Sequence, residues 1–146
     1  MPSEIVTELE IDAPPSLVWR VLCDFDAYPE WNPFVLSMRA KLTEGAKAMA
    51  RFDVGLRRPL PMPLRIVTVD PEREFAWAGG TEPFMQGRHY FRLESLPNNR
   101  TRLIHGEEFT GVLGRVAAPM VKRSRLGANY DKLNQALAAR CATLSS

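Results

Sequence analysis

The chain has 146 residues, a length typical of one domain, and we expect a single domain over residues 1–146. Its 19 basic and 17 acidic residues leave a net charge of +2, which is too small to indicate a nucleic-acid partner. With 45% hydrophobic and 25% charged residues, the composition is that of a globular protein. The sequence contains neither a signal-peptide pattern over residues 1–10 nor an apolar run of the roughly 18 residues needed for a membrane span. We therefore expect a cytoplasmic protein; the oligomeric state stays open.

The N-terminal part of the chain predicts one strand followed by two short helices. Alternating apolar and polar residues over Glu4–Asp12 indicate a half-buried strand. Pro14-Pro15 then favours the start of a helix, which apolar residues at helical spacing carry to Cys23. A turn and a second short helix follow over residues 24–31. The Asn32-Pro33 step ends that helix, because a residue before proline avoids the α conformation.

The middle of the chain has the period-two pattern of β-strands. Six strands are predicted, separated by short turn-forming groups: Phe34–Leu42, Ala46–Gly55, Met62–Asp70, Glu74–Gly79, Phe84–Leu96 and Arg100–Thr110. Short links between consecutive strands predict an antiparallel meander. After Gly111 the apolar spacing changes to three and four residues, which predicts a long amphipathic helix. Pro119 should kink the first part of this helix or separate it from a preceding turn.

The two cysteines show no metal-binding pattern. Cys23 and Cys141 lie far apart in sequence, each within an apolar helical pattern and without a nearby Cys or His at ligand spacing. We expect two free thiols, no metal and no cofactor, because the sequence also lacks a nucleotide-binding loop.

Several short motifs carry a resemblance to a known group of proteins. They are Ala13-Pro14-Pro15, Val18-Trp19, Asp24-Phe25 and the run Tyr28–Phe34. Together with the order of elements, they resemble the SRPBCC superfamily, which includes START lipid-transfer domains, the birch pollen allergen fold and polyketide cyclase/dehydrase-like proteins. The resemblance implies an α+β helix-grip fold: a seven-stranded curved antiparallel sheet wrapped around a long C-terminal helix, with two short helices after the first strand. It also implies an internal cavity for a hydrophobic small molecule.

Strand alternation places both histidines of the chain and one carboxylate on the inner face of the sheet. In the strand over residues 84–96, His89 shares a face with Phe91 and Met85; in the next strand, His105 and Glu107 share a face with Leu103. An imidazole beside a carboxylate can donate or accept a proton near pH 7, so these three residues are candidate catalytic groups. Two alternatives stay open: they position a ligand, or they are satisfied polar residues in a partly wet cavity.

The remaining candidate ligand-binding residues are apolar. Large or flexible side chains from the predicted strands and from the start of the last helix suit an irregular hydrophobic ligand. With the two histidines and Glu107, we expect the ligand to contact Trp77, Met85, Phe91, Leu103, Phe109, Val116 and Met120.

Three functions compete on these patterns. The leading hypothesis is binding of a hydrophobic or aromatic small molecule, such as a lipid, polyketide or quinone-like compound, in the cavity. The alternative is a cyclase- or dehydratase-type enzyme that uses His89, His105 and Glu107 as acid–base groups. A protein-interaction module is the third, and it would require a filled core and an exposed apolar patch.

Overall fold

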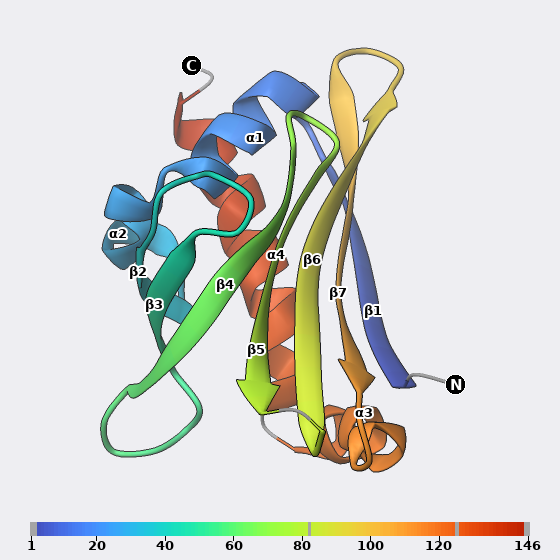
Figure 1. Cartoon of the computed structure of the whole chain (residues 1–146). Coiled ribbons are helices and arrows are strands. Elements are labelled where there is room, and N and C mark those ends of the chain that lie inside the picture. The colour runs from blue at the N-terminus through green and yellow to red at the C-terminus, as the bar shows by residue number, and fades with distance from the viewer. Residues whose placement is uncertain (1–2, 82, 125, 145–146) are drawn as a thin grey trace.

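The protein forms a seven-stranded antiparallel sheet that curves around a long C-terminal helix (Figure 1). The computed structural model describes residues 3–81, 83–124 and 126–144. The elements, in chain order, are β1 (Ser3–Ile11), α1 (Pro15–Cys23), the 3-10 turn η1 (Phe25–Ala27), α2 (Tyr28–Trp31), β2 (Val35–Arg39), β3 (Lys47–Phe52), β4 (Leu60–Asp70), β5 (Glu74–Thr81), β6 (Met85–Leu96), β7 (Arg100–Thr110), α3 (Gly114–Arg123) and α4 (Leu126–Leu144). The α+β helix-grip fold implied by the resemblance is confirmed.

The strands lie in the order β1-β7-β6-β5-β4-β3-β2, so the predicted meander is confirmed and β1 closes it by pairing with β7. Register shifts between Val35 and Ser37 and between Ile66 and Thr68 mark irregularities that help a sheet to curve. Strand β4 begins at Leu60, two residues before the predicted start, and it includes Pro61 and Pro63. Both prolines pair with β3 alone, because pairing of β4 with β5 begins at Arg65. Proline is tolerated at such an edge because its missing N–H is not needed there.

The side chain of Asn32 fixes the backbone between α2 and β2. Oδ1 of Asn32 accepts hydrogen bonds from the backbone N–H groups of Phe34, at 3.0 Å, and Val35, at 2.8 Å. Asn32 itself is extended, with φ −84° and ψ 114°, as expected for a residue before proline. The side chain thus ends the helix and directs the chain into β2, which explains the local structure of the Tyr28–Phe34 motif.

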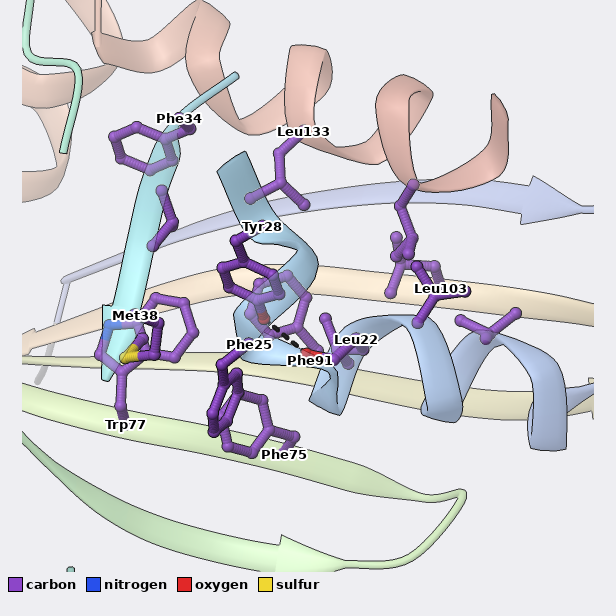
Figure 2. Close-up of a cluster of buried hydrophobic side chains, with 14 of the residues drawn as sticks. Leu22, Phe25, Tyr28, Phe34, Met38, Phe75, Trp77, Phe91, Leu103 and Leu133 are labelled. Carbon is purple, nitrogen blue, oxygen red and sulfur yellow. Dashed lines mark hydrogen bonds between the residues drawn. The ribbon is translucent and has the colours of Figure 1, made fainter. Parts of the chain in front are cut away.

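Side chains of α1, η1 and α2 fill the space between the sheet and α4 near one end of the sheet. Figure 2 shows Phe25 and Tyr28 in this layer, with Phe75 and Phe91 on the sheet side and Leu133 on α4. The ring of Phe25 lies 5.6 Å from that of Phe75, and the hydroxyl of Tyr28 donates to the carbonyl of Leu22 at 2.5 Å. This end of the molecule is a closed core.

The C-terminal region consists of two helices rather than one long helix. Pro119 lies within α3, and the break falls later, at Ser124, whose backbone is extended with φ −85° and ψ 173°. The apolar spacing predicts a core stripe of Leu126, Tyr130, Leu133, Leu137, Cys141 and Leu144 on the last helix. Its middle four residues are buried on α4, whereas Leu144, at the end of the helix, is 44% exposed. Within the ranges described, none of the helices has the length and apolar character needed to cross a membrane.

Candidate functional site

A cavity of about 170 Å³ lies between residues of the sheet and the start of α4, and Val121 of α3 also lines it. Figure 1 shows α3 at this end of the sheet. The walls of the cavity come from β3 to β7 and from both C-terminal helices, and most of them are apolar. Five Phe, Trp or Tyr rings line it, together with the imidazole of His89: Phe34, Phe52, Trp77, Phe109 and Tyr130. A dry cavity of about 150 Å³ with aliphatic and aromatic walls accommodates a benzene molecule, so this one has room for one ring.

Glu107 is the carboxylate in the cavity wall. Its Oε1 accepts a hydrogen bond from the hydroxyl of Tyr130 at 2.5 Å and lies 3.4 Å from Nδ1 of His89. Both groups lie against the same oxygen, so Oε2 is left without a donor from the residues the structure describes. Gly87 makes room for that oxygen, because a Cβ added there would lie 2.3 Å from Oε2.

Neighbouring groups set the charge of this carboxylate. Burial on its own raises the pKa of Glu107, but the hydrogen bond and charge of His89, with the hydroxyl of Tyr130, outweigh burial and lower that pKa. Burial and the charge of Glu107 raise the pKa of Tyr130, which therefore stays a phenol and a donor. The wall of the cavity thus carries an ionised carboxylate at neutral pH.

His89 is fixed between two rings. Its side chain is 3% exposed and stacks on Trp77 at 4.5 Å between ring centres, and on Tyr130 at 5.5 Å. One nitrogen faces Glu107, and the other, Nε2, lies 2.5 Å from Nε2 of His105. The stacking leaves the imidazole no freedom to turn away from these two partners.

His105 lies behind His89 and away from the cavity. It is fully buried, stacks on Phe91 at 4.3 Å, and its Nδ1 lies 2.7 Å from Oδ1 of Asn134. Burial, followed by the charge of His89, lowers the pKa of His105 well below its ordinary value, although Asn134 and the backbone of Tyr130 act in the opposite direction. His105 is therefore a neutral imidazole at pH 7.

The structure brings four of the candidate residues to the cavity and separates the others from it. Trp77, His89, Glu107 and Phe109 line the wall. The remaining candidates lie elsewhere: His105 behind His89, Phe91 and Leu103 buried in the closed core, and Met85, Val116 and Met120 exposed at 37%, 53% and 66%.

The placement of Val116 and Met120 corrects the prediction that they line the cavity. The buried face of α3 is formed by Gly114, Ala117 and Ala118, with Val121 reaching the cavity. These positions follow the three- and four-residue spacing of one helix face, so the two predicted residues lie on the other face. Met85 is corrected for a different reason: it lies at the first position of β6, beyond the inward-facing residues.

The structure also adds polar residues that sequence reasoning left out of the site. Helical spacing alone indicates that Tyr130 is a core residue of the last helix, and Asn134 lies one turn further along the same buried face. Thr7 lies on β1, where the pairing register sets it opposite His105. Among the described residues, no group of three or more His, Cys, Asp or Glu side chains is arranged to hold a metal ion.

Comparisons with known proteins agree with this architecture. A family model described as "Polyketide cyclase / dehydrase and lipid transport" matches residues 3–142. The search of curated proteins finds no match.

Solved structures resemble the chain over nearly its whole length. The Zhui aromatase/cyclase from Streptomyces sp. R1128 is 18% identical, with a TM-score of 0.76 over 100% of this chain and 97% of that one. A START superfamily protein from Mycobacterium smegmatis is 20% identical, with a TM-score of 0.75 over 97% and 98% of the two chains. A point mutant of norcoclaurine synthase from Thalictrum flavum, in complex with a transition-state analogue, is 13% identical, with a TM-score of 0.75 over 100% and 98%. At such low identity these likenesses show the fold alone.

Proposed function

Because the chain belongs to the polyketide cyclase/dehydrase and lipid transport family, within the SRPBCC superfamily, we propose that its cavity binds a small, mostly apolar ring compound that carries a hydrogen-bond donor. One observation carries this proposal. The aromatic-lined cavity contains a carboxylate, Glu107, with one oxygen held by Tyr130 and His89 and the other free of donors.

The size of the cavity limits the ligand. A volume of about 170 Å³ is below the roughly 300–1,000 Å³ of sites for drug-sized molecules. A single substituted ring fits, whereas a multi-ring polyketide or a long acyl chain would have to extend out of the cavity. The ring-sized part of the ligand is therefore the part that the protein recognises.

The charge of the cavity limits the ligand further. A hydroxyl or N–H group of the ligand can donate to Oε2 of Glu107, and a hydrogen bond to a charged acceptor contributes about 1.5–3 kcal/mol. A ligand carboxylate would instead face the charge of Glu107 at short range in a poorly hydrated site. Phenols and ring alcohols therefore suit the cavity, and free fatty acids do not.

Isothermal titration calorimetry with three probes of similar size tests this proposal. We expect p-cresol to bind about tenfold or more tightly than toluene, and benzoate to bind least, because the hydroxyl alone can donate to Glu107. In Glu107→Gln the advantage of p-cresol over toluene should shrink and the penalty on benzoate should fall. Equal affinities of p-cresol and benzoate for the wild-type protein would contradict the proposal.

A second candidate function, proton transfer in a cyclase- or dehydratase-type reaction, is favoured by the contact between His89 and Glu107 at the cavity wall. Cyclisation and dehydration both require that a proton leave carbon and that another reach oxygen. The free oxygen of Glu107 is placed to accept a proton from a ligand, and His89, beside it, can return one.

Hydrogen exchange into an enolisable ring ketone measures this proton transfer without the natural substrate. Phenylacetone in D₂O should exchange its α-hydrogens faster with the wild-type protein than with Glu107→Gln, as read by proton NMR. Equal rates for the two proteins, both at saturating ketone, would count against catalysis and leave the binding function in place.

A further inference from the structure

A chain of hydrogen bonds runs from His89 and Glu107, at the cavity wall, into the protein. At the far end of this chain, the donor and the acceptor of each bond can be assigned. The hydroxyl of Thr7 lies 2.7 Å from the backbone carbonyl of His105. A carbonyl oxygen only accepts, so Thr7 is the donor, and its single hydrogen is used. Nδ2 of Asn134 lies 2.8 Å from the same hydroxyl oxygen and therefore donates to it.

The orientation of the Asn134 amide determines which ring nitrogen of His105 carries the hydrogen. Because Nδ2 of Asn134 faces Thr7, its Oδ1 faces Nδ1 of His105 and accepts from it at 2.7 Å. The hydrogen of the neutral ring thus resides on Nδ1, and Nε2 of His105 is left with a lone pair.

The lone pair on Nε2 of His105 in turn fixes the orientation of the His89 hydrogen bond. Nε2 of His89 lies 2.5 Å from Nε2 of His105, so it donates there and carries a hydrogen. Nδ1 of His89 lies 3.4 Å from Oε1 of Glu107, and a hydrogen between these two atoms avoids two opposed lone pairs. The lowered pKa of Glu107 assigns that hydrogen to Nδ1. His89 therefore holds hydrogens on both nitrogens, and the pair contains one proton more than a neutral imidazole beside a carboxylate.

We propose that His105, oriented by Asn134 and Thr7, is a positioning residue that keeps His89 doubly protonated beside Glu107. The inference rests on the proposed function, because it takes Glu107 as the residue of the His89–Glu107 pair that contacts the ligand. His105 acts through His89 and touches no ligand. Its role is to present Nε2 as a hydrogen-bond acceptor to His89. His89 then keeps its second proton on Nδ1, beside Glu107 and the cavity.

Reversing the hydrogen on His105 shows what the acceptor contributes. If Nε2 of His105 carried the hydrogen, Nε2 of His89 would have to accept it. His89 would then need one hydrogen, on Nδ1, to satisfy Glu107. The donor-to-acceptor direction of the buried hydrogen bonds therefore decides whether His89 and Glu107 together hold an extra proton.

Nitrogen NMR of ligand-free, ¹⁵N-histidine-labelled protein at pH 7 tests this proposal, since the chain has two histidines. Long-range correlations between the ring nitrogens and carbon-bound hydrogens distinguish protonated from unprotonated nitrogens. We expect both nitrogens of His89 to be protonated, and for His105 a protonated Nδ1 with a bare Nε2.

Two variants separate the acceptor from the shape of the ring. His105→Phe keeps a ring against Phe91 but removes the acceptor, so His89 should lose one of its two N–H signals. His105→Gln offers an amide oxygen to His89 and an amide N–H to Asn134, so both signals should be retained.

Three results would overturn the proposal: a hydrogen on Nε2 of wild-type His105, a single N–H on wild-type His89, or an unchanged His89 in His105→Phe. The wild-type spectrum decides the matter even if His105→Phe does not fold. Since no ligand is added, failure of p-cresol to bind would refute the proposed function and leave the protonation result unaffected.

Discussion

The layer between the sheet and α4 differs sharply between its two ends. Near α1 it is solid, because Leu22, Phe25 and Tyr28 fill the space over the sheet (Figure 2). Near α3 it contains the cavity, and Tyr130 from the first turns of α4 lies across it. The same helix and the same long strands therefore build a core at one end and a binding site at the other.

Small residues account for part of this difference. On β5 and β6 the inward positions change from Phe75 and Phe91 at the closed end to Gly79 and Gly87 at the cavity end. A side chain at Gly79 would meet Leu64 at 2.6 Å, and one at Gly87 would meet Glu107. Where α1 and α2 supply no side chains, glycine leaves space for a carboxylate and a ligand. Mutations at the closed end, near α1, should therefore mainly change stability, and mutations at the cavity end, near α3, should mainly change ligand binding.

The largest effect should come from truncation at the closed end. Phe91→Ala removes a fully buried ring that stacks on His105, and such changes cost about 3–5 kcal/mol. Leu103→Ala should cost about 2–5 kcal/mol for the same reason. Urea unfolding measures both. Leu103→Ala in particular should leave the affinity for p-cresol unchanged, and a selective loss of binding with normal stability would place Leu103 at the site after all.

A pH effect should follow from the buried neutral His105. Its pKa is lowered by folding, so below the ordinary value of 6.5 the unfolded chain binds a proton that the folded protein does not. Stability should consequently fall as pH falls, with His105 contributing about 1.5 kcal/mol between pH 6.5 and 5. Urea midpoints across this range measure the slope. His105→Gln serves as the reference, and an equally steep slope in that variant would assign the effect to other groups.

A smaller and more selective effect is expected at the cavity end. Gly87→Ala should displace the carboxylate of Glu107 and weaken p-cresol binding about tenfold, while stability changes by about 1 kcal/mol or less, because a side-chain terminus can move aside. Gly79→Ala is the matched control, since it adds the same volume to the wall against Leu64 instead. Equal losses of affinity in both variants would mean that volume matters and the position of Glu107 does not.

The smallest effects should come from the exposed face of α3. Val116→Ser and Met120→Ser alter side chains that are 53% and 66% exposed, so stability should change by about 0.5 kcal/mol or less. Calorimetric affinity for p-cresol should equal that of the wild-type protein. A tenfold loss in either variant would show that α3 rotates to bring this face to the ligand.

Much of the site could be predicted from strand alternation alone. A period of two placed His89, His105 and Glu107 on the inner face, and the structure has them there. Their order from the cavity inward could not be predicted, because it depends on how β7 pairs with both neighbours and on where α4 crosses the sheet. Tyr130 illustrates this limit: helical spacing identified it as buried, but only the tertiary fold places its hydroxyl on Glu107.

The helix ends show a second limit. Pro119 was expected to kink or divide the C-terminal helix, yet it sits inside α3 and the break occurs at Ser124. Spacing within residues 111–124 alone does not say which face of α3 meets the sheet, and the small residues Gly114, Ala117 and Ala118 were buried in preference to the larger Val116 and Met120. Close approach to β1 and β7 at this position favours the face with the smallest side chains.

The most direct test of the account is a crystal structure of the wild-type protein soaked with p-cresol. We predict the ring within the aromatic walls formed by Phe34, Trp77 and Tyr130, with its hydroxyl within hydrogen-bond distance of Oε2 of Glu107. A cavity that stays empty at saturating p-cresol, or a bound ring whose hydroxyl points away from Glu107, would contradict the central claim that this carboxylate selects the ligand.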